Sequence, residues 1–165
     1  MHGTLRRCWP LALAAALLAA GCAAQGPEGG TRPQPAASFS FTTLEGETIA
    51  LEDLGGRPVV LNFWTSWCPA CAMLAPHLQA LYEEHEEQGL VVLGISPEDT
   101  PEALRAKAQE LGIRYPVGIS AEAGRAYGVR SIPVTYFIDR EGRVVSTLVG
   151  AQTRERVREE IEKLL

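Results

Sequence analysis

A Cys-x-x-Cys motif between an apolar run and a helical repeat constrains this chain more than any other feature. The run at residues 58–64 (Pro-Val-Val-Leu-Asn-Phe-Trp) is β-branched and aromatic, which indicates a buried strand. Apolar residues then recur at a helical spacing, at Leu74, Leu78, Leu81 and Tyr82. The motif therefore lies at the entrance of a predicted helix, with Cys68 preceding the helix and Cys71 in its first turn.

This placement predicts a reversible dithiol. Side chains three residues apart lie on one helix face, about 5–6 Å from each other, within the range that a disulfide requires. Pro69 fits the first helical position, where its missing N–H costs nothing. The free N–H groups and positive dipole end of the helix stabilise a thiolate on Cys68. We therefore expect Cys68 to be the more exposed nucleophile and Cys71 to be the deeper, resolving cysteine.

The first 21 residues are predicted to be a signal peptide of the lipoprotein type. Arg6 and Arg7 precede an apolar stretch at residues 11–20, which ends in small residues just before Cys22. This junction resembles a bacterial lipobox, whose cysteine is lipidated and becomes the first residue of the mature chain. Ordinary signal cleavage and an uncleaved anchor are the alternatives.

A flexible tether and one folded domain are expected after the signal peptide. Residues 22–37 comprise Cys22 and a Gly- and Pro-rich stretch with almost no large apolar residue, which is typical of a linker. Residues 38–165 carry the remaining strand and helix patterns.

Cysteine usage and charge narrow the class of protein further. Of the four cysteines, Cys8 leaves with the signal peptide and Cys22 carries the lipid, so Cys68 and Cys71 remain as one pair. A single such pair in an exported domain is unlike a multi-bridge secreted scaffold and indicates redox work outside the cytoplasm. The net charge of −5, without a basic patch, argues against a nucleic-acid partner. We expect a membrane-anchored lipoprotein on the extracytoplasmic, periplasmic side.

The remaining patterns alternate strands with helices. Strands are predicted at residues 90–96, 117–119, 133–139 and 143–149, with a hairpin in 38–50; helices are predicted at 51–56, 69–88, 101–111, 121–127 and 153–165. This order indicates a mixed sheet in an α/β sandwich.

These elements and motifs resemble the thioredoxin superfamily, specifically the membrane-tethered thiol–disulfide oxidoreductases of the TlpA/ResA type. The resemblance rests on residues 60–71 (Val-Leu-Asn-Phe-Trp-Thr-Ser-Trp-Cys-Pro-Ala-Cys), Pro76 within the helix, an added strand and helix within 91–129, and residues 127–139 (Tyr-Gly-Val-Arg-Ser-Ile-Pro-Val-Thr-Tyr-Phe-Ile-Asp). It implies a thioredoxin-like sandwich with a central mixed β-sheet flanked by helices, an N-terminal β-hairpin and a central strand–helix insertion.

The resemblance also implies a second part of the site. Pro133 is expected to follow a cis peptide bond and to pack against the active-site sulfurs. The backbone of Ile132 would then pair with an extended substrate segment. Trp67, Pro69 and Ala70 are expected to support the site. Trp64 either shields it with Trp67 or belongs to the core.

Two positions depart from the family pattern. Asn62 stands where thioredoxin carries a buried acid, and Leu74 stands where some ResA-type relatives place a glutamate. Neither proton-handling carboxylate is present, so the deprotonation of Cys71 has no obvious assistant.

Other residues of the helix are expected to have ordinary roles. Met73 is predicted to lie in the core. His85 stands among four glutamates and is predicted to lie on a solvated helix face rather than in a metal site. No third soft ligand accompanies the cysteines, so no metal or other cofactor is expected.

The function implied by the resemblance is reduction of disulfides in exported proteins. The implied client is apocytochrome c or a related assembly factor, and the implied electron donor is a membrane protein of the DsbD/CcdA type. A lipid anchor would hold the protein, which we expect to be a monomer, at the membrane.

Two alternatives differ in their chemistry. A peroxiredoxin-like thiol peroxidase fits the Thr65-x-x-Cys68 pattern, although Leu61 stands where that family has a proline. A non-enzymatic copper-handling lipoprotein would favour a wider cysteine spacing and a distant histidine ligand, both of which this sequence lacks.

Overall fold

The computed structural model describes residues 33–165. The predicted signal peptide, Cys8 and Cys22 lie outside these residues. No helix of the described part is both long and apolar enough to cross a membrane.

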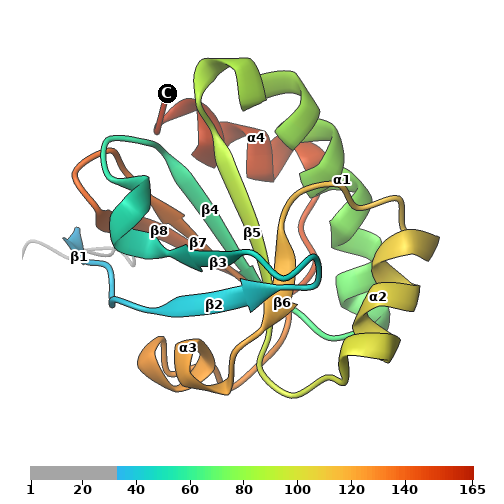
Figure 1. The fold of residues 1–165 in the computed structure, drawn as a ribbon. Helices are drawn as coiled ribbons and strands as arrows, with labels where there is room; N and C mark the ends of the chain where they lie inside the picture. The colour runs from blue at the N-terminus through green and yellow to red at the C-terminus, as the bar shows by residue number, and fades with distance from the viewer. Residues whose placement is uncertain (1–32) are drawn as a thin grey trace, which may run out of the picture.

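Eight strands form one mixed sheet in the order β1-β8-β7-β4-β5-β6-β2-β3. The strands are β1 (Gln34–Pro35), β2 (Ser40–Thr43), β3 (Thr48–Ala50), β4 (Val59–Phe63), β5 (Val91–Ser96), β6 (Val117–Ile119), β7 (Val134–Ile138) and β8 (Arg143–Val149). The helices are α1 (Pro69–His85), α2 (Pro101–Glu110), α3 (Ala121–Ala126) and α4 (Arg154–Glu162), with 3₁₀ turns η1 (Leu51–Leu54) and η2 (Glu86–Gln88). The patterns of the sequence predicted this mixed sheet in an α/β sandwich, and the family resemblance implied its thioredoxin-like architecture (Figure 1).

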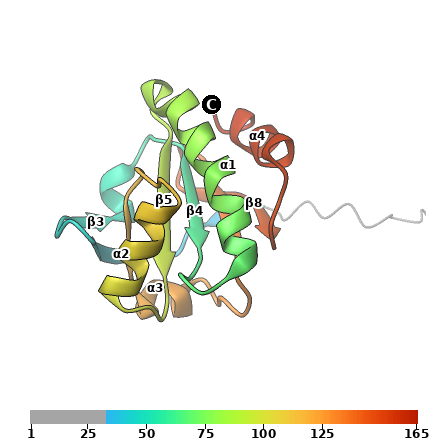
Figure 2. The ribbon, with the colours of Figure 1, turned by 90° about the vertical axis from the view of Figure 1, so that its right-hand side faces the viewer.

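Helices cover both faces of the sheet, and α1, α2 and α4 lie on the same face (Figure 2). The opposite face is covered by α3 and η1. Because β4 lies between β5 and β7, every residue of β4 is buried and its side chains alternate between the two layers. Val60 packs under α1, whereas Leu61 belongs to the layer of α3.

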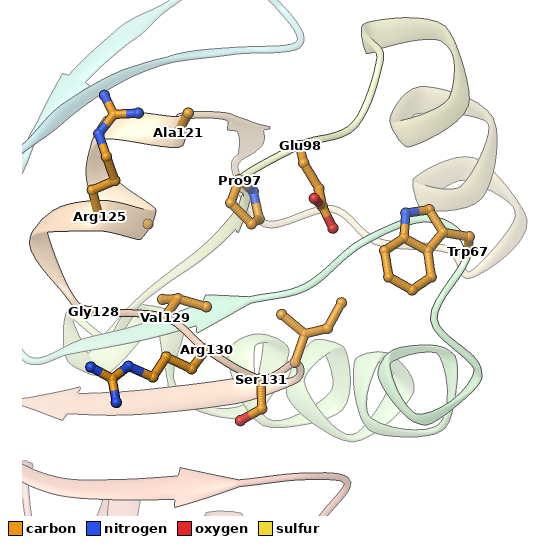
Figure 3. Close-up of a pocket in the computed structure, with 11 residues that line it drawn as sticks. Trp67, Pro97, Glu98, Ala121, Arg125, Gly128, Val129, Arg130 and Ser131 are labelled. Atoms are coloured by element: carbon orange, nitrogen blue, oxygen red, sulfur yellow. The ribbon is translucent and has the colours of Figure 1, made fainter.

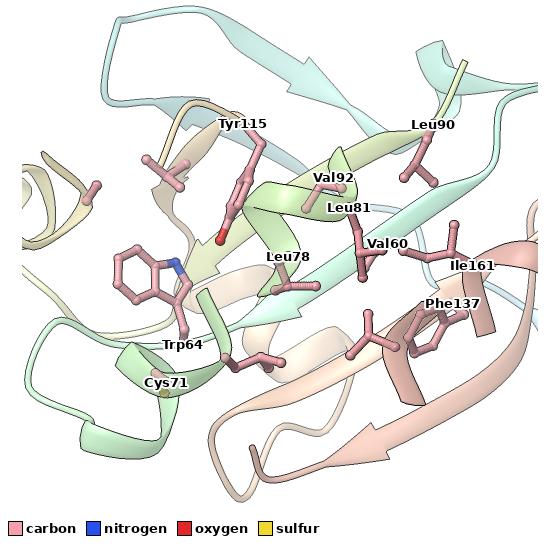
Figure 4. Packing of buried hydrophobic residues seen from close by; sticks show 14 of the residues in the cluster. Val60, Trp64, Cys71, Leu78, Leu81, Leu90, Val92, Tyr115, Phe137 and Ile161 are labelled. Atoms are coloured by element: carbon pink, nitrogen blue, oxygen red, sulfur yellow. The ribbon is translucent and has the colours of Figure 1, made fainter. Parts of the chain in front are cut away.

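The helix that follows the cysteines is fixed by its apolar stripe. Leu74, Leu78 and Leu81 are all buried between α1 and the sheet. Figure 4 shows Leu78 and Leu81 in this layer. Each such side chain contributes roughly 1.5–3 kcal/mol relative to an exposed position. The first turn of α1 is therefore held at a fixed place over the end of β4.

The sheet begins earlier than the sequence predicted. Gln34 and Pro35, in the stretch expected to be tether, form β1 and pair antiparallel with β8. The amide of Ala36 also donates to the carbonyl oxygen of Gly142 at 2.9 Å. Proline is compatible with this position because an edge strand needs hydrogen bonds on one side only.

Register places two loops at the same end of the central strands. Phe63, the last residue of β4, pairs with Val134, the first residue of β7. The chain leaves β4 toward Cys68 and enters β7 from Pro133, so the two loops that carry the expected site residues meet at this edge.

Candidate active site

The two cysteines form a disulfide at the start of α1, with their Cα atoms 5.2 Å apart. Cys68 is the N-cap residue of α1, and Pro69 occupies the first helical turn, as predicted. The amide of Cys71 donates to Cys68 Sγ at 3.1 Å. A thiolate on Cys68 would accept this bond and face the positive end of the helix dipole.

The two cysteine residues differ in their exposure to solvent. Cys68 is 7% exposed and Cys71 is 2% exposed. Both belong to the buried cluster under α1, where Figure 4 shows Cys71. The greater exposure of Cys68 makes attack by an external disulfide sterically easier there.

The peptide bond between Ile132 and Pro133 is cis, as the resemblance implied. Pro133 is buried, and its carbonyl oxygen accepts a hydrogen bond of 2.8 Å from the amide of Gly150. The side chain of Ile132 packs against the cluster that contains both cysteines. Among residues 33–165, no backbone hydrogen bond reaches Ile132, which leaves its amide and carbonyl groups available to an incoming strand.

The two tryptophans have different surroundings. Trp64 is buried in the cluster that contains the cysteines, so it has the core role that was one of its two expected roles. Trp67, directly before Cys68, is 64% exposed. Trp67 therefore presents an exposed aromatic surface directly before the disulfide. Ala70, between the cysteines, packs half-buried against the cluster.

Asp99 holds the loop that precedes Cys68, and sequence reasoning missed it. Its carboxylate accepts hydrogen bonds from the amide of Ser66 at 2.8 Å and from the Ser66 hydroxyl at 2.6 Å. The hydroxyl of Ser96, at the end of β5, donates to the same carboxylate at 2.8 Å. Asp99 precedes Thr100, the N-cap of α2, so a helix-capping segment was the only local signal.

Asn62, which stands where thioredoxin has a buried acid, makes only neutral hydrogen bonds. Asn62 is buried in β4, and its Nδ2 donates to Thr135 Oγ1 at 3.0 Å and to the Val134 carbonyl oxygen at 3.4 Å. Leu74 lies in the apolar core. Neither side chain provides a proton acceptor for Cys71.

Two expectations for α1 were wrong. Met73 is 68% exposed, because it lies off the stripe of leucines that faces the sheet. His85 is buried, and its Nδ1 lies 3.1 Å from Gln88 Nε2. Within residues 33–165, no group of three or more His, Cys, Asp or Glu side chains is arranged to hold a metal ion.

A cleft of about 580 Å³ opens beside the disulfide loop. Trp67 and Glu98 lie toward one end of this cleft, and Arg125 and Arg130 lie toward the other (Figure 3). Ile132, whose backbone is unpaired, also lines it. The cleft therefore extends from Trp67, the residue before Cys68, along the loop before Pro133.

Comparison with known families and curated proteins gives a consistent result. A model of the AhpC/TSA family matches residues 33–147. Thiol-disulfide oxidoreductase ResA of Bacillus thuringiensis (strain Al Hakam) is 34% identical over 133 residues, which cover 78% of this chain and 76% of that protein. ResA of Halalkalibacterium halodurans is 33% identical over 131 residues, which cover 78% of this chain and 74% of that protein.

Solved structures with the same fold include two with similar sequences. A thiol:disulfide interchange protein of the thioredoxin family from Chlorobium tepidum TLS superimposes with a TM-score of 0.75 and 26% identity, over 81% of this chain and 97% of that one. StoA from Bacillus subtilis superimposes with a TM-score of 0.66 and 25% identity, over 76% of this chain and 96% of that one.

Proposed function

Because the chain belongs to the AhpC/TSA family and is a thiol–disulfide oxidoreductase of the ResA type, we propose that it reduces disulfides of exported proteins through Cys68 and Cys71. The observation that carries this proposal is a disulfide at the N-terminus of α1, beside the loop of a cis-proline. Trp67, Pro69, Ala70, Ile132 and Pro133 would support the client at this site.

The reaction is a two-step exchange. The Cys68 thiolate attacks one sulfur of the client disulfide, whose S–S bond breaks, and the second client sulfur leaves as a thiolate that takes up a proton. Cys71 then loses its proton and attacks Cys68 Sγ. The mixed disulfide breaks, the first client sulfur leaves, and the Cys68–Cys71 bond closes. Two electrons have moved from the enzyme to the client, and the oxidised enzyme matches the state of this structure.

The proton of Cys71 must leave without the help of a nearby carboxylate. Asn62 and Leu74 offer no carboxylate, so the Cys71 proton passes to water or to the departing client thiolate. The helix terminus supplies the remaining help in the first step, because it favours the thiolate form of Cys68, which is the attacking nucleophile.

The place in the cell follows from the N-terminal sequence. We propose that residues 1–21 are a signal peptide and that Cys22 carries a lipid that anchors the domain at the extracytoplasmic face of the membrane. Cys22→Ser should move the protein from the membrane fraction to the soluble fraction and remove the acyl mass from its N-terminal peptide. An unchanged distribution and mass would contradict lipidation.

Client and electron donor are proposed by analogy with the ResA relatives. Apocytochrome c, or a related assembly factor, is the client, and a membrane protein of the DsbD/CcdA type returns the enzyme to its dithiol form. The protein acts as a monomer that needs no cofactor of its own.

Insulin reduction by dithiothreitol tests the activity. The purified protein in detergent should accelerate it, and Cys68→Ser should abolish the acceleration. Cys22→Ser is the matched control because it removes a cysteine outside the pair, and it should retain the activity. Equal rates for wild type and Cys68→Ser would refute the proposal.

A thiol peroxidase is the second candidate, because the AhpC/TSA model matches and Thr65-x-x-Cys68 is present. The hydroxyl of Thr65 is buried without a hydrogen-bond partner among the described residues. Dithiol exchange is favoured because Cys71 lies within bonding distance of Cys68. Hydrogen peroxide should therefore be consumed at about the rate of free cysteine; consumption orders of magnitude faster would favour the peroxidase.

A further inference from the structure

Two arginines of the described chain differ from every other basic residue there. Within residues 33–165, all other lysines and arginines form an ion pair or a hydrogen bond with the protein. Arg125, in α3, and Arg130, in the loop before Pro133, form neither with these residues, and both are exposed. Two guanidinium groups therefore present their donors to solvent.

Both arginines line the cleft beside the disulfide loop. Figure 3 places them toward the end of the cleft that is farther from Trp67. Glu98, the carboxylate that lines the cleft, lies nearer Trp67 in this view. The cleft is therefore polarised, with positive charge at the far end and negative charge near the redox centre.

The path of a client leads past these arginines. If a client strand pairs with the free backbone groups of Ile132, its neighbouring residues continue along Ser131 and Arg130. Arg130 precedes Ile132 by two positions, which spans at most about 7 Å of extended chain. A client residue two or three places from the reacting cysteine thus comes within reach of Arg130, and the segment beyond it comes near Arg125.

The positive end of the cleft is opposite in sign to the net charge of the chain. With a net charge of −5, the protein as a whole repels acidic partners. Unpaired guanidinium groups in a cleft create a local positive potential and match carboxylates in a bidentate geometry. Charge complementarity therefore selects an acidic occupant for this end of the cleft.

We propose that the cleft binds an acidic segment of the client protein, with Arg125 and Arg130 pairing with its carboxylates while the client's cysteine meets Cys68. This inference rests on the proposed disulfide reduction and names the class of client that it favours: proteins whose disulfide cysteine is followed or preceded at two or three positions by aspartate or glutamate.

The test uses short peptides that contain one cysteine, blocked as a mixed disulfide with 2-mercaptoethanol. Three sets carry glutamate, glutamine or lysine at the second and third positions on one side of the cysteine, with each side tested separately. The rate constant for reduction is measured with the reduced full-length protein, at low and at high salt. Arg125→Gln/Arg130→Gln is compared with Arg105→Gln, which removes a positive charge on α2, outside the cleft.

In the wild-type protein, one set of glutamate peptides should be reduced on the order of five times faster than its glutamine counterpart at low salt, and lysine peptides should be slowest. The preference should shrink at high salt because exposed ion pairs are screened. In the double variant the ratio of glutamate to glutamine rates should fall to about one, whereas Arg105→Gln should keep the wild-type ratio.

Several outcomes would overturn the inference. Equal wild-type rates for all three sets would do so, as would an acidic preference that survives in the double variant. In a further experiment, binding to anionic phosphatidylglycerol vesicles is compared between the wild-type protein and the double variant. Without a peptide preference, weaker vesicle binding by the double variant would assign the arginines to a membrane surface instead. Failure of the wild-type protein to reduce even the glutamine peptides would refute the disulfide-reductase function itself, which is a separate result.

Discussion

The Asp99 carboxylate should contribute measurably to the stability of the folded protein. It ties the loop before Cys68 to the end of β5 through the amide and hydroxyl of Ser66 and the hydroxyl of Ser96. Asp99→Ala removes the acceptor of all these bonds at once. Within residues 33–165, no carboxylate other than that of Asp99 is hydrogen-bonded to Ser66.

The magnitude follows from the burial of each donor. A hydrogen bond to a charged group contributes about 1.5–3 kcal/mol, but a donor that reaches water recovers most of this energy. Ser66 is half-buried and regains water, whereas Ser96 is fully buried and its hydroxyl loses its acceptor. We therefore expect Asp99→Ala to lower the free energy of unfolding by about 2–4 kcal/mol, and Asp99→Asn by about 1–2 kcal/mol because the amide retains one oxygen acceptor.

Guanidinium unfolding of the oxidised protein measures both effects. The midpoint should fall while the slope stays unchanged, since the loss concerns the native state and not the area exposed on unfolding. Asp53→Ala is the matched control because Asp53 is exposed and its side chain makes no hydrogen bond among the described residues. A loss of less than about 0.5 kcal/mol for Asp99→Ala, equal to that of the control, would refute this reasoning.

Further predictions concern the core, the sheet and the acid response. Leu78→Ala should cost about 3–5 kcal/mol in chemical unfolding because the side chain is fully buried; a loss below 1 kcal/mol would contradict the packing. Gly118→Ala should cost at least about 2 kcal/mol, since its new Cβ would clash with the Thr42 carbonyl oxygen; an unchanged midpoint would contradict the close approach of β6 and β2. For Asp139, burial raises the pKa, but hydrogen bonds and charge from Arg143 outweigh it, so the pKa lies below its ordinary 3.8. The folded state therefore binds fewer protons than the unfolded state, and the stability advantage of wild type over Asp139→Asn should be complete at neutral pH and shrink as pH falls below about 4. An advantage that grows with acidification would have the wrong sign.

The sequence predicted most of the secondary structure because its signals are local. Apolar runs mark β4 and β5, and Thr100 and Thr153 accept hydrogen bonds as the N-caps of α2 and α4. The cis bond before Pro133 was expected from the family resemblance alone, since no local signal distinguishes it from a trans bond.

Where the structure differs from the sequence-based predictions, the cause can be identified. β1 has two residues and no apolar period, and it exists because Gln34 and Pro35 meet β8. His85 was assigned to a solvated face from its acidic neighbours, although it continues the buried spacing of Leu78 and Leu81 by one more turn. That signal was available in the sequence.

Asp99 and the unpaired arginines depended on tertiary structure. Asp99 is separated from Ser66 by a whole helix and strand, so its role appears only when β5 pairs with β4. Arg125 and Arg130 were indistinguishable from other surface arginines until the structure showed which basic residues have partners.

Trapping of the mixed disulfide tests the central claim most directly. The reduced Cys71→Ser protein is mixed with oxidised insulin, quenched with acid and mapped by mass spectrometry without reductant. Cys71→Ser should give a one-to-one adduct through Cys68 that persists because no resolving thiol is present, and Cys68→Ser should give none of this adduct. An adduct that forms through Cys71 in Cys68→Ser as readily, or no adduct in Cys71→Ser while insulin is still reduced, would contradict the claim.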